Sequence, residues 1–173
     1  TGNLPARIRW SRSERAALSY GYGLSVTAVQ LASAYTALAN NGERLPPSLL
    51  RLSEPPQGIP AIEPSVANDL LEILETSVGA YTGGRRARVE GYRVGGKTGT
   101  VRKTGQQGYA TDAYRSVFAG IAPISDPRIV TVVMIDHPKA GEFYGGAVAA
   151  PVFSSVTGNA LRLLDVPPDY EVE

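Results

Sequence analysis

The fold is decided by residues 114–136, which read YRSVFAGIAPISDPRIVTVVMID. Two runs rich in β-branched and aromatic residues, 114–121 and 128–136, flank the turn-rich segment 123–127, and this pattern is typical of two strands joined by a turn. A link this short requires antiparallel strands, because a parallel pair needs a crossover of about a dozen residues or more. A further strand, interrupted by glycines, is predicted over 93–101.

Helices are predicted before and after these strands. Apolar residues repeat at the helical period over 28–39, and Thr27 with Gln30 matches a capping box. A second helix is predicted over 65–78 and a closing helix over 148–164. The predicted fold class is therefore α/β, with an antiparallel β-sheet flanked by helices.

The sequence also predicts the segments that precede and connect these helices, and the position of a proline in the last one. Residues 1–23 are predicted to be an irregular entry to the domain, and the proline-rich stretch 43–64 to be an extended connection. Pro151 is expected in the first turn of the closing helix, because a proline further inside would lack a backbone N–H for the helical hydrogen bond.

Composition excludes several classes of function. The 173 residues are 43% hydrophobic, which fits one domain or part of one. A net charge of +1 gives no general attraction to nucleic acid. The chain has no cysteine and a single histidine, His137, so thiol catalysis and cysteine-ligated zinc are excluded. No metal and no cofactor are predicted.

Residues 95–100, Gly-Gly-Lys-Thr-Gly-Thr, are the sharpest motif, and they allow two interpretations. Residues 91–98 satisfy G-x-x-x-x-G-K-[ST], the phosphate-binding loop. Such a loop must lead into a helix whose amides face the phosphate, yet the residues after Thr98 show no helical period. A nucleotide-binding module therefore stays only a remote alternative.

The second interpretation places Lys97, Thr98, Gly99 and Thr100 on an edge strand. Lys-Thr-Gly is one of the motifs of penicillin-binding proteins and serine β-lactamases. On a strand Thr98 and Thr100 point to one face, so both hydroxyls can hold one carboxylate. Gly99 leaves room for an approaching backbone, and Lys97 adds positive charge.

Several other stretches support the second interpretation, and together with the motif they make the chain resemble class B penicillin-binding proteins, in particular the division-specific transpeptidases. These stretches are Gly2-Asn3-Leu4-Pro5, residues 18–27, Tyr114-Arg115-Ser116, Asp126-Pro127-Arg128, Tyr144-Gly145-Gly146, Ala150-Pro151-Val152-Phe153 and Pro167-Pro168-Asp169-Tyr170. The resemblance implies the fold shared by penicillin-binding-protein transpeptidases and serine β-lactamases.

Two motifs of that family are missing from the sequence. The chain contains neither S-x-x-K, which carries the nucleophilic serine and its lysine base, nor S-x-N. We therefore expect residues 1–173 to be the C-terminal part of a single transpeptidase domain whose upstream part holds both motifs. The chain alone is expected to be inactive.

The resemblance implies a peptidoglycan D,D-transpeptidase that cross-links stem peptides ending in D-Ala-D-Ala during septal cell-wall synthesis. It would act through a serine acyl-enzyme and be inhibited by β-lactams. Thr98 and Thr100 would bind the substrate carboxylate, the Thr100 N–H would donate to the oxyanion, and Lys97 would tune the serine of the middle motif.

Further residues are assigned to substrate or β-lactam binding by the same resemblance: Tyr22, Arg102, Phe143, Tyr144 and Gly145. Arg85, Arg86 and Arg88 are interpreted as a solvated loop, with contact to a glycan or a partner as the alternative.

The resemblance also implies partners and a location. The expected partners are the N-terminal half of the same protein and proteins of the division machinery, with no nucleic acid. The location would be the periplasmic face of the bacterial inner membrane, with the anchor upstream of this chain. The alternative function is a non-catalytic penicillin-recognising sensor or pseudo-enzyme.

Overall fold

The centre of the molecule is an antiparallel sheet of three strands in the order β3-β4-β5. The computed structural model describes residues 2, 3, 9–105 and 108–170, with the backbone alone for 104, 105 and 108–112. The strands are β3 (Gly95–Gly105), β4 (Gly108–Ala122) and β5 (Ile129–Asp136). The predicted antiparallel arrangement is confirmed, and β3 and β4 extend further toward their shared hairpin than predicted.

The pairing of β3 with β4 fixes where the motif lies. Lys97 lies opposite Ala119 and Thr100 opposite Ser116, and the register then shifts between Arg102 and Thr104. Arg102 pairs with Tyr114 and Thr104 with Tyr109, so β4 has three more residues than β3 between these two pairs and the regular ladder is interrupted there. The four motif residues therefore lie in the regular part of the ladder, on a strand that is outermost in the described sheet.

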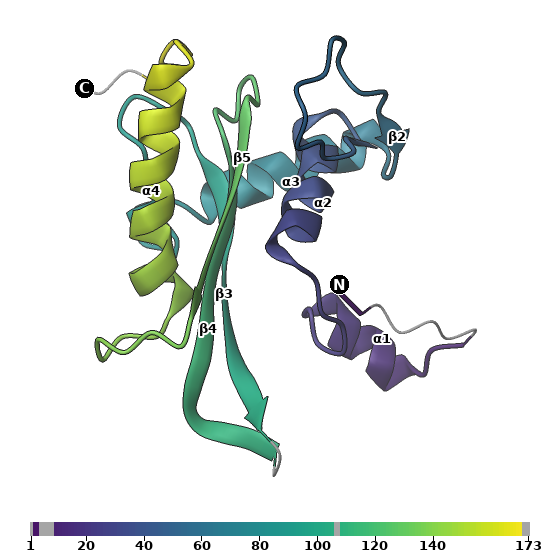
Figure 1. Cartoon of the computed structure of the whole chain (residues 1–173), viewed down its shortest axis with the longest axis vertical. Coiled ribbons are helices and arrows are strands. Elements are labelled where there is room, and N and C mark those ends of the chain that lie inside the picture. Colours follow the sequence, from purple (N-terminus) through teal and green to yellow (C-terminus); the bar gives the residue numbers. More distant parts are fainter. Residues whose placement is uncertain (1, 4–8, 106–107, 171–173) are drawn as a thin grey trace.

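Helices cover both faces of the sheet, as Figure 1 shows. One face is covered by α2 (Ala28–Ala39) and α3 (Pro64–Thr76), and the other by α4 (Gly145–Leu163) with the short 3₁₀ helix η1 (Arg85–Ala87). The connection between α2 and α3 is extended, as predicted, and carries the short strands β1 (Glu43–Arg44) and β2 (Ile59–Pro60).

A helix in the N-terminal region corrects the prediction that residues 1–23 are irregular. Helix α1 spans Arg12–Ser19 and begins with a complete capping box. The Glu14 N–H donates to the Ser11 hydroxyl at 3.2 Å, and the Ser11 N–H donates to the Glu14 carboxylate at 2.9 Å. The S-x-x-E spacing was the available signal, but α1 buries no residue, so it lacks the apolar stripe on which the prediction relied.

The position of Pro151 is a second correction. Helix α4 begins at Gly145 rather than near residue 148, so Pro151 lies inside the helix and not in its first turn. Because proline has no N–H, the Ala147 carbonyl loses its partner four residues on. The Arg86 guanidinium donates to that carbonyl instead, at a long 3.5 Å.

Two apolar clusters hold the layers together. On the α4 side Phe118 and Phe153 are fully buried, with ring centroids 4.7 Å apart. On the α2 and α3 side Leu71 packs with Ile121 and Ile124. Phe118 and Ile121 point to opposite faces of β4, so this strand contributes to both clusters, as expected of a strand buried on two sides.

The C-terminal segment is tied to this core by Tyr92, whose buried hydroxyl donates to the Val166 carbonyl at 2.6 Å. Tyr92→Phe leaves a carbonyl of the buried Val166 without this donor, so we expect the purified protein to lose about 1–3 kcal/mol of stability. Urea unfolding measures this loss. Tyr81→Phe, at a fully exposed side chain, should leave the unfolding midpoint unchanged; an equal loss in both variants would contradict the assignment.

In the part of the chain that the structure describes, no helix is both long enough and apolar enough to cross a membrane.

Candidate functional site

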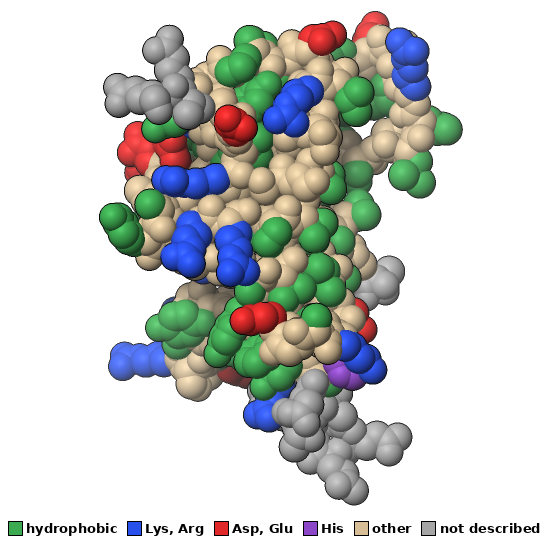
Figure 2. Space-filling view, turned by 90° about the vertical axis from the view of Figure 1, so that its left-hand side faces the viewer, with side chains coloured by type: hydrophobic (Ala, Val, Ile, Leu, Met, Phe, Trp, Pro, Cys, Tyr) green, Lys and Arg blue, Asp and Glu red, His purple; other side chains and the backbone are tan. Residues whose placement is uncertain are grey.

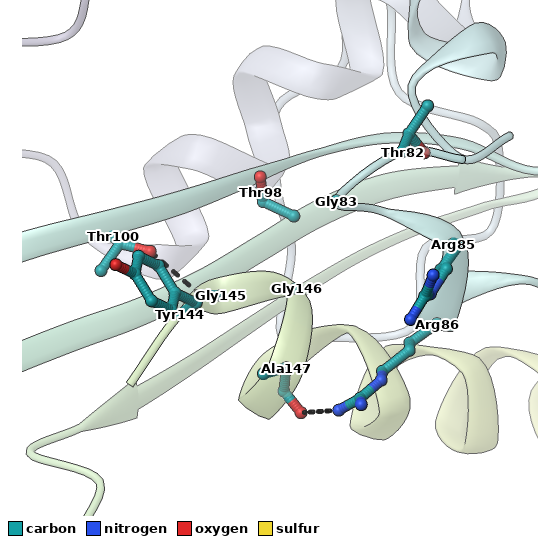
Figure 3. Close-up of a pocket in the computed structure, with 10 residues that line it drawn as sticks. All are labelled: Thr82, Gly83, Arg85, Arg86, Thr98, Thr100, Tyr144, Gly145, Gly146 and Ala147. Carbon is teal, nitrogen blue, oxygen red and sulfur yellow. Dashed lines mark hydrogen bonds between the residues drawn. The ribbon is translucent and has the colours of Figure 1, made fainter. Parts of the chain in front are cut away.

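A hollow of about 350 Å³ lies where β3, the start of α4 and the loop before η1 meet (Figure 3). Its volume is in the range of small-ligand sites. Three segments far apart in the sequence supply its lining, which consists of Thr82, Gly83, Arg85, Arg86, Thr98, Thr100, Tyr144, Gly145, Gly146 and Ala147.

Strand β3 contributes the two threonines of the motif. Thr98 and Thr100 both line the hollow, as the alternation of a strand requires. The strand continues beyond them to Gly105, and no helix begins after Thr98. The phosphate-binding-loop alternative is therefore not supported, because the strand after Thr98 provides no helix N-terminus to point its amides at a phosphate.

The Thr100 hydroxyl is held by the first turn of α4. The Gly145 N–H donates to Thr100 Oγ1 at 3.0 Å. A hydroxyl that accepts this bond keeps its own hydrogen as a donor, so it can bind an anion in the hollow. Gly145 permits the approach, because a β-carbon there would lie only 2.5 Å from the Gly99 carbonyl oxygen.

A buried serine fixes the segment that leads into α4. Ser116 lies opposite Thr100 on β4 and is fully buried. Its hydroxyl donates to the Phe143 carbonyl. Strand β3 therefore carries Thr100, and Ser116 on β4 holds the segment that leads to Gly145, whose N–H donates to the Thr100 hydroxyl.

Three aromatic rings continue from the edge of the hollow. Phe143 stacks on Tyr114 with centroids 4.1 Å apart and contacts Tyr144 at 4.5 Å. The Arg102 guanidinium carbon lies 5.9 Å from the centroid of Tyr114, within the range of a cation–π contact. Arg102 and Phe143 are therefore neighbours of the hollow through this stack.

Lys97 brings positive charge next to the threonines. Its side chain is exposed, and Nζ lies 3.3 Å from the Thr98 carbonyl oxygen and 3.4 Å from Thr98 Oγ1. Among the described residues Lys97 forms no ion pair with a carboxylate. Its charge is therefore not neutralised by a neighbouring acid.

The basic residues further along the hairpin differ in this respect. Lys103 and Arg115 bind the Asp136 carboxylate at 2.8 and 2.9 Å. Hydrogen bonds from Lys103 and then Arg115 lower the pKa of Asp136. This cluster ties β3 and β4 to the end of β5.

The structure brings together most of the site residues predicted from the sequence. Thr98, Thr100, Tyr144 and Gly145 line the hollow, Lys97 and Gly99 share their strand, and Arg102 and Phe143 belong to the adjoining stack. Tyr22 lies in the turn after α1, is 60% exposed and is not part of the lining.

Two residues that line the hollow were predicted from the sequence to lie in a solvated loop. Arg85 and Arg86 are exposed, as expected of a solvated loop, but they also form one end of the hollow. Their charge was visible in the sequence, whereas their position depends on how η1 packs on α4. No group of three metal-ligating His, Cys, Asp or Glu side chains occurs in the described residues.

Comparison with known proteins identifies the family. The model of the penicillin binding protein transpeptidase domain matches residues 1–158. The chain belongs to this family. The resemblance noted from the sequence is thereby confirmed.

Related proteins carry names that agree with this family assignment. The chain is 45% identical over 168 residues to the probable peptidoglycan D,D-transpeptidase PbpC of Pseudomonas aeruginosa, covering 97% of this chain and 30% of that protein. It is 40% identical over 169 residues to the peptidoglycan D,D-transpeptidase FtsI of Escherichia coli, covering 98% and 29%. The chain thus spans about three tenths of the length of these relatives.

A solved structure confirms the fold. The apo transpeptidase domain of Burkholderia pseudomallei penicillin-binding protein 3 superposes with a TM-score of 0.90 at 44% identity, covering 98% of this chain and 52% of that one. The penicillin-binding-protein fold predicted from the sequence is therefore present, as a portion of the full transpeptidase domain.

Proposed function

We propose that residues 1–173 form the C-terminal part of a single transpeptidase domain in a peptidoglycan D,D-transpeptidase, and that they supply its carboxylate-binding wall. The observation that carries this proposal is the pair Thr98 and Thr100 on the outer strand β3, with the Thr100 hydroxyl oriented by the Gly145 N–H at 3.0 Å. The missing motifs S-x-x-K and S-x-N would lie in the upstream part.

In the proposed reaction an upstream serine Oγ attacks the carbonyl carbon between the two terminal D-alanines of a stem peptide. The serine proton passes through a lysine base to the leaving D-alanine amine, and the C–N bond breaks. An amine of a neighbouring stem peptide then attacks the acyl-enzyme carbonyl carbon and forms the cross-linking amide, the ester C–O bond breaks, and a proton of the amine returns through the lysine to the serine Oγ. A β-lactam mimics the D-Ala-D-Ala dipeptide, and its reaction with the serine stops at the acyl-enzyme.

Most of the predicted site residues have a place in this scheme; Tyr22, which lies outside the hollow, has none. Thr98 and Thr100 hold the carboxylate of the leaving residue, and the Thr100 N–H is one donor to the oxyanion, a contribution of about 3–4 kcal/mol in comparable enzymes. Lys97 raises the positive potential beside them. Gly99 and Gly145 keep the wall open, Tyr144 borders the bound ligand, and Arg102 and Phe143 lie behind it in the adjoining stack.

The wider setting is also proposed from the family. FtsI among the relatives supports a role in cell division, hence septal synthesis together with proteins of the division machinery. The site would lie on the periplasmic side of the inner membrane. A non-catalytic sensor is the weaker candidate, because the relatives are named as transpeptidases.

Reaction with a fluorescent penicillin tests the proposal. The full-length protein should form a covalent adduct that survives denaturation, whereas residues 1–173 alone should form none, because the proposed nucleophile lies upstream. Gel fluorescence and intact-mass spectrometry measure both. A full-length protein that does not react, or an adduct mapped to one of these 173 residues, would contradict the proposal.

A further inference from the structure

The hollow has a basic end that the proposed reaction does not use. In Figure 3, Thr100 and Tyr144 lie at one end, Arg85 and Arg86 lie at the other, and Thr98 lies between them. Figure 2 shows Lys and Arg side chains close to one another on the face of the molecule that α4 covers. The same hollow is therefore lined by the neutral hydroxyls of Thr98 and Thr100 and by two guanidinium groups.

The backbone that carries these arginines is fixed. Ala87, the last residue of η1, is fully buried, and its N–H donates to the Gly84 carbonyl at 2.8 Å. The preceding loop is held by the Thr82 hydroxyl, which donates to the Ser77 carbonyl at 2.6 Å. The backbone on both sides of the two arginines is thus held by burial and hydrogen bonds.

In the part of the chain that the structure describes, the two arginines are not paired with an acid. Within the described residues neither Arg85 nor Arg86 forms an ion pair, whereas Arg93 pairs with Glu75 at 2.7 Å. The lining of the hollow contains no carboxylate. A guanidinium has five N–H donors, and the one bond recorded for Arg86, to the Ala147 carbonyl, leaves most of them for a ligand.

We propose that Arg85 and Arg86 form a second anion-binding subsite, which accepts a carboxylate or sulfonate on the leaving-group side of the ligand. The inference rests on the proposed function, in which Thr98 and Thr100 hold the carboxylate of the leaving residue. A second anionic group attached next to that carboxylate enters the same hollow and reaches the arginines. The preferred ligand therefore carries two negative charges on that side.

The chemistry of the pair fits an anion of this kind. Planar guanidinium groups bind carboxylates and sulfonates through two parallel N–H bonds, with geometry that a lysine ammonium lacks. Lys97 adds to the positive potential at the threonine end, so both ends of the hollow favour negative charge. The volume of about 350 Å³ leaves room for a short side chain beyond the first carboxylate.

The test uses two cephalosporins and the full-length protein. One carries, beside its ring carboxylate, a carbon-linked side chain that ends in a carboxylate; the other is its primary carboxamide. We expect the wild type to be acylated by the dianion about tenfold faster than by the amide, the effect of one charge-assisted hydrogen bond. The double variant Arg85→Gln/Arg86→Gln should bring this ratio close to one.

Two further variants make the test specific. Arg85→Gln alone removes one charge and leaves the hydrogen bond between Arg86 and the Ala147 carbonyl in place. It should lower the acylation ratio severalfold. Its unfolding midpoint should equal that of the wild type, which separates loss of charge from loss of structure. Arg88→Gln is the matched control, because this exposed arginine lines a different hollow and should leave the ratio as in the wild type.

The outcomes separate the inference from the proposed function. A wild-type protein acylated by both compounds, with a ratio that the double variant does not change, overturns the subsite alone. An equal fall of the ratio in Arg88→Gln also overturns it, because the effect is then general electrostatics. A wild-type protein acylated by neither compound overturns the proposed function and the subsite with it.

Discussion

Replacing Thr98 by valine in the full-length protein is expected to slow acylation by penicillins about ten- to a hundredfold. Valine keeps the β-branched shape that suits a strand and removes only the hydroxyl. A hydrogen bond from that hydroxyl to a carboxylate contributes roughly 1.5–3 kcal/mol, and each 1.36 kcal/mol is a factor of ten in rate. Second-order acylation rates, from stopped-flow or quenched reactions, measure the effect.

Two companion variants check that the hydroxyl is responsible. Thr98→Ser keeps the donor and should be acylated at nearly the wild-type rate. Thr76→Val removes an exposed hydroxyl that donates to the Ile73 carbonyl within α3, far from the motif in sequence, and it should have no effect on the rate. Wild-type acylation of Thr98→Val, or equal slowing in both valine variants, would show that the carboxylate binds elsewhere.

Gly96→Ala should cost both stability and activity. An added β-carbon would lie 2.6 Å from Phe118 Cζ and 2.7 Å from the Ala119 carbonyl oxygen, and Phe118 is fully buried. Because neither neighbour can give way freely, we expect a loss of about 1–3 kcal/mol. A shift of β3 by about 1 Å would displace Thr98 and Thr100 and slow acylation about a hundredfold.

The neighbouring glycine of the same strand provides the control for stability. A β-carbon at Gly99 would meet only Val117 Cβ, at an ordinary 3.6 Å. Gly99→Ala should therefore unfold at nearly the wild-type temperature, while Gly96→Ala unfolds several degrees lower. If both variants melted together, the close contact between Gly96 and Phe118 would not be what positions the strand.

The elements that the sequence predicted correctly are those with strong local signals. The helix over 28–39 has both an apolar period and a capping box, and it is observed with those bounds. The antiparallel pairing of β4 with β5 followed from the length of their link alone. Helix α1 was missed because its start is signalled only by Ser11 and Glu14, and it has no buried face.

The candidate site was only partly predictable for a different reason. Thr98 and Thr100 could be placed together because strand alternation is a local property. Their proximity to the arginines of η1 depends on packing between segments 82–86, 98–100 and 144–147, which no local pattern encodes. The bond between Gly145 and Thr100 likewise depends on where α4 begins, and the sequence placed that start about three residues too late.

The register shift between Arg102 and Thr104 divides the β3–β4 hairpin into two parts. On the motif side the ladder is in regular register, and Asp136 clamps Lys103 and Arg115 at its outer limit. Because the ladder is already interrupted there, we expect a residue added or removed beyond the shift to leave the pairing of Thr98 and Thr100 unchanged. We therefore expect that a short peptide grafted beyond the shift would leave the two threonines in place, so this end of the hairpin is a site for engineering.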